Sequence, residues 1–160
     1  MDGVLADFAT AAGDFFGIDF NKGFVKVENV EWARLKEEWP TFWLDLDVLP
    51  YAMDLWRGIH PWNPSLLTAT PDGWRSAGTG KELWAKRHLP KFGYHPQQKV
   101  HAVRRSEKKN FAKSDGQPNV LIDDLEKNIS EWERAGGIGV LYTPSRSAIQ
   151  TVVDTLQSVV

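Results

Sequence analysis

The sequence predicts a three-layer α/β fold, with helices on both faces of a parallel sheet and a small helical cap inserted after the first motif. Short apolar runs alternate with helical patterns over the second half of the chain. The first sixty residues hold helical patterns with no convincing strand between them. A length of 160 residues suits one domain with a substantial core rather than two independent domains.

Four short apolar runs predict the strands of the sheet. Most of them are almost continuously apolar, as expected for strands that are covered on both faces. They are SLLTAT (65–70), KVHAV (99–103), NVLID (119–123) and IGVLY (138–142).

Three patterns with helical spacing predict the helices that cover this sheet. Gly136 and Gly137 would stop the second helix, and Ser145 would cap the third. The glycine-rich AGTGKE (77–82) lacks the spacing of a phosphate-binding P-loop, so we interpret it as a loop and a helix start. The three patterns cover residues 80–89, 126–136 and 145–160.

The first sixty residues predict three further helices. Gly17 would end the first, Glu28 or Asn29 would begin the second, and Pro50 would lie in the first turn of the third. Gly23 is expected in a connection. The patterns are DFATAAGDFFGI (7–18), VENVEWARLKEEW (27–39) and PYAMDLWRGI (50–59).

These patterns divide the chain into a core and a cap. We assign residues 1–8 and 61–160 to the α/β core and residues 9–60 to the small helical cap. The first strand of the core is missing from this division, because only Met1 precedes the opening motif.

Composition excludes several classes of protein. Without cysteine, the chain cannot form disulfides, thiolate metal sites or a cysteine nucleophile. It has no secretory pattern at its start and no run of eighteen apolar residues, so we expect a cytoplasmic protein without a membrane role.

Charge is distributed unevenly along the chain. Residues 1–60 carry 5 Lys/Arg and 11 Asp/Glu, whereas residues 61–160 carry 14 and 10. The basic excess is concentrated in KVHAVRRSEKKNFAK (99–113), a stretch too local for duplex nucleic acid. It suits a compact anion such as a phosphate.

Polar residues stand at or just beyond the ends of the predicted strands. Ligands of open parallel sheets bind outside the carboxyl ends of the strands, so these side chains can converge on one point. They are Asp2, Thr68, Lys108 or Lys109, Asp123 and Asp124.

The adjacent carboxylates Asp123 and Asp124 indicate a divalent cation. Two like charges at a strand end repel each other, and a cation relieves that repulsion. Mg²⁺ is commonly held by one or two aspartates together with a substrate phosphate. A nearby lysine and hydroxyl would complete a site for a phosphoryl group.

Four segments resemble the successive motifs of the haloacid dehalogenase-like hydrolases, in the same order. They are most similar to the 5'(3')-deoxyribonucleotidase branch, which includes many phage and bacterial members. The resemblance covers residues 1–129 and implies a Rossmann-like core with a small cap. It implies a Mg²⁺-dependent phosphomonoesterase that acts on nucleoside monophosphates through an aspartyl phosphate. The segments are MDGVLADF, LLTAT, SEKKNFA and LIDDLEKNI.

The resemblance also implies roles for individual residues. Asp2 matches the second aspartate of the DxDG motif, which exchanges the proton and contacts the metal. Thr68 matches the hydroxyl that binds the phosphoryl group, and Lys108 matches the lysine of the third motif. Asp123 and Asp124 match the acidic motif that positions Mg²⁺.

Four more residues are expected to contact the substrate. The segment that holds Phe42 and Trp43 resembles the cap-to-core return of nucleotidases, so these rings would either lie against a nucleobase, which stacks on aromatic rings whatever the base, or pack within the cap. Ala69 follows the motif hydroxyl, and Lys109 is a rival to Lys108. The expected partner is therefore a small phosphate ester, a nucleotide above all; the oligomeric state is open, a homodimer being one option.

The opening motif departs from the family, because the nucleophilic aspartate would stand immediately before Met1. We expect the sequence to be truncated there; the alternatives are an inactive protein whose sheet has closed over the gap, or a strand supplied by another chain. Loss of a central strand would expose two unpaired ladders. Covalent phosphoryl transfer should fail in the chain as given. The alternative function is therefore an inactive phosphate- or nucleotide-binding protein, or an interaction protein.

Structural roles compete with these functional ones. Thr68 alone could be a buried strand hydroxyl, and Asp124 could cap the helix that follows it. Trp56, Trp84 and Trp132 have the spacing of packing anchors.

Overall fold

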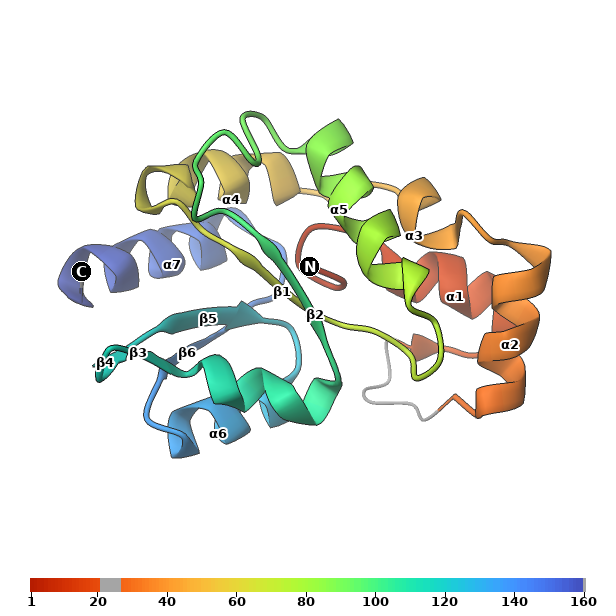
Figure 1. Cartoon of the computed structure of the whole chain (residues 1–160). Coiled ribbons are helices and arrows are strands. Elements are labelled where there is room, and N and C mark those ends of the chain that lie inside the picture. The colour runs from red at the N-terminus through yellow and green to blue at the C-terminus, as the bar shows by residue number, and fades with distance from the viewer. Residues whose placement is uncertain (21–26, 160) are drawn as a thin grey trace.

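The computed structural model describes residues 1–20 and 27–159, and Gly23 lies outside them. It has an α/β architecture in which helices surround short parallel strands (Figure 1). The four strands predicted from the apolar runs are confirmed. They are β1 (Leu66–Ala69), β2 (Val100–Val103), β5 (Val120–Asp123) and β6 (Ile138–Leu141).

These strands form two parallel pairs. β1 pairs with β2, with Leu66 opposite Val100, and β5 pairs with β6, with Val120 opposite Ile138. Within the described residues the two pairs are separate two-stranded sheets, and no strand joins them. A small antiparallel hairpin of β3 (Lys113–Ser114) and β4 (Gln117–Pro118), which the sequence did not predict, precedes β5.

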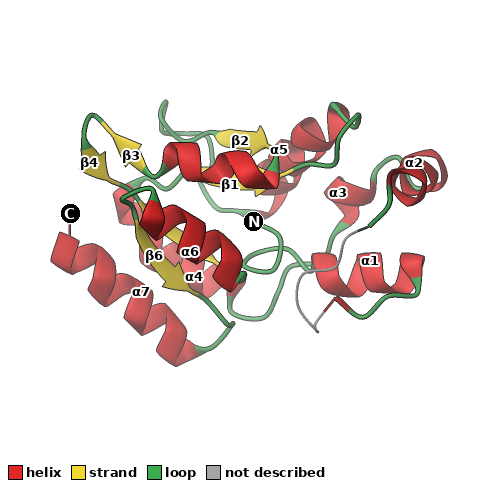
Figure 2. Ribbon diagram, turned by 90° about the horizontal axis from the view of Figure 1, so that it is seen from below, coloured by secondary structure: helices red, strands yellow, loops and turns green. Residues whose placement is uncertain are grey.

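Helices cover both strand pairs. α5 (Ser76–His88) packs on β2, and α6 (Glu126–Arg134) packs on β5 and β6. α7 (Arg146–Val159) packs against α4 (Ala52–Ile59), as Figures 1 and 2 show. As predicted, Ser145 caps α7, because its Oγ accepts a hydrogen bond from Ala148 N at 3.1 Å.

α5 begins earlier than the sequence predicted. Gly78, interpreted as a loop residue, and Gly80, interpreted as the first residue of the helix, both lie inside α5. A Cβ on Gly78 would come within 2.8 Å of Ala102 Cβ, and one on Gly80 within 3.1 Å of Trp43 Cβ. The two glycines therefore allow close packing of the helix, and the loop interpretation of residues 77–79 was wrong.

The first sixty residues are helical, as predicted. α1 (Phe8–Phe16) ends at Gly17, which has the left-handed φ of 69° typical of a helix end. α2 (Asn29–Glu38) has Glu28 as its N-cap. The unpredicted α3 (Phe42–Asp45) follows, and Pro50 precedes α4 rather than lying in its first turn.

One hydrophobic core joins the predicted cap to the predicted core. Its buried side chains come from α1 to α4 as well as from β1, α5 and α7. Trp56, Trp84 and Trp132 are packing anchors, as predicted, with at most 3% of their surface exposed. The indole nitrogen of each donates to a backbone carbonyl, at 2.9, 2.7 and 3.0 Å respectively.

Two short 3-10 helices complete the described chain. η2 (His60–Trp62) connects α4 to β1, and η3 (Arg105–Phe111) follows β2. None of the helices in the described ranges has the length and apolar character needed to cross a bilayer.

Candidate functional site

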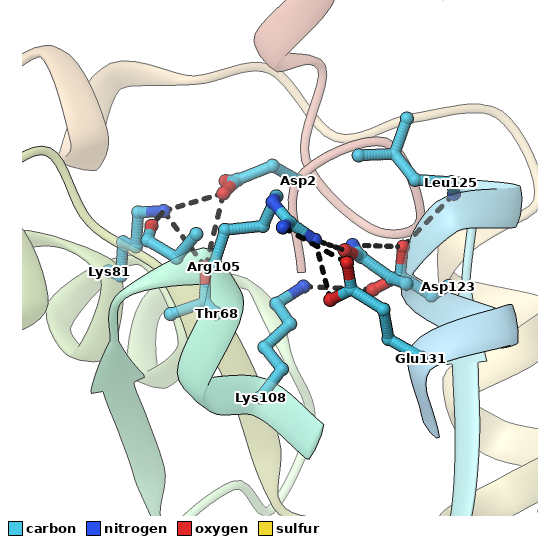
Figure 3. A network of polar contacts seen from close by, with 10 residues as sticks. Asp2, Thr68, Lys81, Arg105, Lys108, Asp123, Leu125 and Glu131 are labelled. Carbon is cyan, nitrogen blue, oxygen red and sulfur yellow. Dashed lines mark hydrogen bonds and ion pairs between the residues drawn. The ribbon is translucent and has the colours of Figure 1, made fainter. Parts of the chain in front are cut away.

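The opening residues form a tight loop rather than a strand. Met1 O accepts hydrogen bonds from the backbone nitrogens of Val4, Leu5 and Ala6, at 3.2, 2.8 and 3.2 Å. Gly3, at φ 71°, makes the turn and donates to Ala6 O at 3.1 Å. The loop turns Asp2 toward β1 (Figure 3).

Asp2 lies at the centre of the first group of site residues. Its Oδ2 accepts a hydrogen bond from Thr68 Oγ1 at 3.1 Å and another from Lys81 Nζ at 2.5 Å. Burial alone would raise the pKa of Asp2, but the positive charges of Lys81 and the Met1 amino group lower it below its usual value. Asp2 Oδ1 is buried and has no hydrogen-bond partner within the described chain.

Lys81 was not predicted as a site residue. Its side chain is fully buried, and its Nζ donates to Thr68 Oγ1 at 2.8 Å and to Ala69 O at 2.6 Å, as well as to Asp2. The same nitrogen lies 4.0 Å from the ring centre of Trp43, a cation–π contact. Burial lowers the pKa of Lys81, which the carboxylate of Asp2 opposes.

A sequence signal for Lys81 existed. Ala77, Lys81, Trp84 and Ala85 follow the i, i+4, i+7, i+8 spacing of the buried face of a helix. A lysine on such a face needs a buried partner, because an isolated buried charge is costly.

Thr68 and Ala69 have different contacts. Thr68 is the buried strand hydroxyl that its sequence context indicated, and that hydroxyl also contacts Asp2 and Lys81. Ala69 contacts Lys81 through its backbone oxygen. Whether either residue binds a substrate stays a prediction.

Asp123, at the end of β5, organises the second group. Its Oδ2 accepts from Lys108 Nζ at 2.8 Å, and its Oδ1 accepts from Leu125 N at 3.0 Å and Asn128 Nδ2 at 2.8 Å. Asp123 therefore supports the start of α6. The capping role considered for Asp124 was wrong, because no side chain caps this helix at its N-cap.

The structure separates the two candidate lysines. Lys108 is buried and directed at Asp123, whereas Lys109 is exposed. Lys109 instead borders a hollow of about 530 Å³, which is also lined by Glu131 and Arg134. Of the two, only Lys108 is paired with a site carboxylate.

Arg105 holds η3 against α6, a role that the sequence did not reveal. Its guanidinium donates two hydrogen bonds to Glu131, at 2.9 and 3.2 Å, and one to Asn128 Oδ1 at 3.0 Å. Asn128 also contacts Asp123, so the contacts of Arg105 with Glu131 and Asn128 fix η3, the helix that carries Lys108.

Gly3 connects the two groups, because Asp124 approaches it closely. A Cβ on Gly3 would overlap the Asp124 carboxyl group. Desolvation and the neighbouring charge of Asp123 raise the pKa of Asp124 to about 6, although part of its side chain is exposed. Figure 3 shows the groups of Asp2 and Asp123 on two sides of one site.

The aromatic residues expected at the substrate lie in a packed cluster. Phe42 is 0% exposed, and its ring centre lies 4.8 Å from that of Trp43 and 6.0 Å from that of Phe8. Trp43 stacks on Phe8 and contacts Lys81. Their contact with a nucleobase stays a prediction.

The resemblance implies Mg²⁺, and two of the three expected carboxylates fit it. Within residues 1–20 and 27–159, no three Asp, Glu or His side chains are grouped as a metal site. Both oxygens of Asp123 already accept hydrogen bonds. The unpartnered Asp2 Oδ1 and the raised pKa of Asp124 suit an added cation. Since Mg²⁺ often takes one or two carboxylates with phosphate and water, Asp2 and Asp124 are the residues that fit.

No protein-family model matches this chain, and no curated protein matches it. The motifs and the geometry of these residues are therefore the basis for a function.

Proposed function

We propose that this chain, when a strand ending in a nucleophilic aspartate precedes it, is a Mg²⁺-dependent phosphomonoesterase of the haloacid dehalogenase-like type, with a three-layer Rossmann-like core and a small cap. One observation carries the proposal. Asp2, Thr68 and Lys81 at β1 share a site with Lys108 and Asp123 at β5, at the carboxyl ends of two parallel strand pairs.

A phosphate group is the ligand that these side chains suit best. Two buried ammonium groups and the Thr68 hydroxyl can donate hydrogen bonds to phosphate oxygens. Both ammonium groups are paired with carboxylates, so a phosphate would compete with Asp2 for Lys81 and with Asp123 for Lys108.

Asp2 would carry the proton. Lys81 and the Met1 amino group lower its pKa, so its carboxylate is ionised at neutral pH and can accept a proton. A phosphate that draws Lys81 away from Asp2 would raise this pKa. The carboxyl could then take up a proton from water and donate it to the leaving oxygen.

Mg²⁺, when bound, would supply positive charge that offsets the phosphate oxygens. Asp2 and Asp124 would hold it, while Asp123 positions Lys108 and the start of α6. A nucleoside monophosphate is the favoured substrate, because the four motifs resemble those of the deoxyribonucleotidase branch.

A second function fits the same geometry: binding of a phosphate ester or nucleotide without turnover. An aspartyl-phosphate route needs a nucleophilic carboxylate in addition to Asp2. Asp2 and Asp123 are each paired with a lysine, which disfavours both as nucleophiles. The resemblance assigns the nucleophile to the position before Met1.

Hydrolysis of 4-nitrophenyl phosphate and of nucleoside monophosphates, with Mg²⁺ and with EDTA, separates the two functions. The 160-residue chain should be compared with a version preceded by an apolar strand that ends in aspartate. We expect Mg²⁺-dependent turnover only in the extended version. Absence of turnover in both, together with tight phosphate binding, would support the binding function instead.

Binding of inorganic phosphate, followed by calorimetry, tests the site itself. Lys81→Met and Lys108→Met should each weaken binding by about tenfold or more, since each removes a charged donor. Lys109→Met is the matched control and should change it little. Equal losses in all three variants, or no phosphate binding by the parent chain, would contradict both functions.

A further inference from the structure

A hollow on the surface where η3 meets α6 carries positive charge that the described chain does not neutralise. Its volume is about 530 Å³, and it is lined by Lys109, Asn110, Glu131, Arg134 and Ala135. Lys109 and Arg134 are exposed, and neither forms an ion pair with a residue in 1–20 or 27–159. Two cations therefore border this hollow without a carboxylate partner.

The carboxylate of the lining is already paired. Both oxygens of Glu131 accept hydrogen bonds from Arg105, at 2.9 and 3.2 Å. These hydrogen bonds, together with the positive charges of Arg105, Lys127 and Lys109, lower the pKa of Glu131. Glu131 is therefore ionised at neutral pH and neutralised by Arg105, so the charge of Lys109 and Arg134 is left for a ligand.

The end of α6 does not take up this charge either. Its last carbonyl groups accept hydrogen bonds from the backbone nitrogens of residues 135–137. Arg134 donates from its Nε to Ser130 O at 3.0 Å, and its two terminal nitrogens make no contact within the described chain. These two nitrogens form a planar fork of donors, which suits the oxygens of an anion.

η3 lies between this hollow and the site of Asp123. Lys108 and Lys109 are consecutive residues, and a 3-10 helix turns by about 120° per residue. Lys108 Nζ accordingly contacts Asp123 at 2.8 Å, while Lys109 borders the hollow. Adjacent lysines of one short helix thus serve two different places on the molecule.

Arg105 links the same two places (Figure 3). Its guanidinium donates to Glu131, which lines the hollow, and to Asn128 Oδ1 at 3.0 Å. Asn128 Nδ2 in turn donates to Asp123 at 2.8 Å. A ligand that disturbs the pair of Arg105 and Glu131 therefore disturbs the support of Asp123 as well.

We propose that this hollow binds a compact polyanion, and that an occupied hollow weakens phosphate binding at the site of Lys108. The second half of the proposal rests on the proposed phosphate site. A water molecule takes up about 30 Å³ of the liquid, so one phosphate group would leave most of the hollow to water. An anion with several charged groups fills more of it and can contact Lys109 and Arg134 together.

The lining also limits the chemistry of the ligand. Four of the five lining residues are polar or charged, which disfavours an apolar ligand. The unpaired charges are positive, which disfavours a cation. Polyphosphates and polycarboxylates share the chemistry that remains, because both carry several groups whose oxygens accept hydrogen bonds from lysine and arginine.

Two effects set the direction of the coupling. The polyanion brings negative charge to a helix that already attracts phosphate on another side, and the two anions repel each other. It also competes with Glu131 for Arg105, which then holds Asn128 less firmly. Coupling between two sites is reciprocal, so phosphate should weaken binding of the polyanion by the same factor.

An NMR titration of the 160-residue chain with tripolyphosphate, in the presence of EDTA, locates the binding site. The amides of Asn110 and Ala135 should shift and reach saturation. Citrate, titrated separately, shows whether a polyphosphate or a polycarboxylate binds the hollow more tightly. Shifts confined to Asp2 and Thr68 would place the polyanion at the phosphate site alone and would overturn the proposal.

Charge variants test the lining. Lys109→Met and Arg134→Met should each weaken binding of tripolyphosphate at the hollow by about tenfold. Lys99→Met removes an exposed charge outside the lining and is the matched control. Equal losses in all three variants would show that binding follows net charge rather than the hollow, and would overturn the proposal.

Calorimetry with inorganic phosphate measures the coupling. Tripolyphosphate, at a concentration that saturates the hollow, should weaken phosphate binding by about fivefold. The same concentration should have no effect on a chain with both Lys109→Met and Arg134→Met. A loss that persists in this double variant would mean direct competition at the phosphate site, and unchanged phosphate binding in the parent chain would exclude the coupling.

The two proposals fail in different ways. Absence of phosphate binding by the parent chain would overturn the proposed function and the coupling together. Binding in the hollow is judged separately, by the shifts at Asn110 and Ala135, and their absence would overturn it even in a chain that binds phosphate.

Discussion

At the residue scale, the ion pair of Asp2 and Lys81 is central to the site. Lys81 is fully buried, and its three acceptors and the Trp43 ring replace the water that its charge has lost. A buried charge is tolerated only when it is paired in this way. The pair therefore links the stability of α5 to the chemistry of the opening loop.

Replacement of Lys81 by methionine should destabilise the fold. Lys81→Met leaves Asp2 Oδ2 without its charged donor, so we expect the free energy of unfolding in urea to fall by about 1–3 kcal/mol. Lys86→Met, which breaks an exposed pair with Glu82 on the same helix, should cost about 0.5 kcal/mol or less. Equal losses in the two variants would show that the buried pair contributes nothing.

Gly3 provides a second test at this scale. Gly3→Ala places a Cβ at φ 71° and against the Asp124 carboxyl group, whereas Gly17→Ala places one at φ 69° with no atom within 4 Å. Both variants should lose about 1–2 kcal/mol from the left-handed backbone. Overpacking should cost Gly3→Ala at least about 1 kcal/mol more in urea unfolding.

A rescue variant isolates this contact. Gly3→Ala with Asp124→Ala should recover most of the excess loss, because the second change removes the overlapping carboxyl group. If Gly3→Ala is no worse than Gly17→Ala, Asp124 does not approach the opening loop as described.

At the element scale, short connections position the site. Arg105 holds η3 on α6, and Asp123 supports the start of α6, so the helix that carries Lys108 is fixed at both sides. Likewise, Asp45 accepts hydrogen bonds from Trp39 Nε1 at 2.8 Å and Thr41 Oγ1 at 2.6 Å, which joins α2 to α3.

The Asp45 contacts predict a pH dependence. Hydrogen bonds from Thr41 and Trp39 lower the pKa of Asp45, so its folded pKa lies below its unfolded value. Its contribution to stability is therefore present above about pH 4 and is lost as the pH falls through the lowered pKa. We expect Asp45→Ala to cost about 0.5–1 kcal/mol in urea at pH 7, and progressively less below pH 4.

Asp47→Ala is the control for this prediction. Asp47 is a nearby exposed aspartate whose side chain has no hydrogen bond among the described contacts. Its replacement should change stability little at either pH. A loss in Asp45→Ala that stays constant from pH 7 to pH 3 would exclude the ionised carboxylate as its cause.

The sequence predicted where the helices and strands lie better than it predicted which strands pair with one another. Continuous apolar runs identified all four long strands, since burial on both faces leaves a direct mark on the sequence. α3 has only four residues, too few for a periodic pattern. The first turn of α5 was missed because a glycine such as Gly78 usually indicates a loop, while here it allows close packing.

The candidate site was predicted only in part, because a sequence pattern records residues that are close together in the chain. Asp2, Thr68, Lys108 and Asp123 belong to the motifs at or beyond strand ends, and the structure brings them to one site. Lys81 and Arg105 act through contacts with residues distant in the chain, which a local pattern does not record. The separation of Lys108 from Lys109 likewise needed the direction of each side chain.

At the scale of the whole molecule, the division of the sheet is the main feature. The sequence indicates which segments are strands, but hydrogen-bonded neighbours depend on packing that no single run of residues encodes. β1 is paired with β2 along one edge, and β5 is paired with β6 along one edge. The other edge of each strand borders a groove of about 650 Å³ between the two pairs. In a continuous sheet both edges of such strands would be paired.

Hydrogen exchange followed by NMR should reveal these edges in the chain alone. Amides at Leu67, Val120 and Ile122 should exchange much faster than those at Thr68, Leu121 and Asp123, because only the latter face a bonded strand. The alternation should repeat along both strands. Uniform protection of consecutive residues would mean that the groove edges are already paired.

The indole of Trp43 gives this protein a built-in optical reporter. Its ring carries the ammonium of Lys81 on one side and is stacked in the cluster with Phe8 and Trp32. An anion that draws that ammonium aside should alter the electric field across the indole, and with it the emission of Trp43. The chain has eight tryptophans, so comparison of the parent chain with Trp43→Phe isolates this emission and lets occupancy of the site be followed without an attached dye.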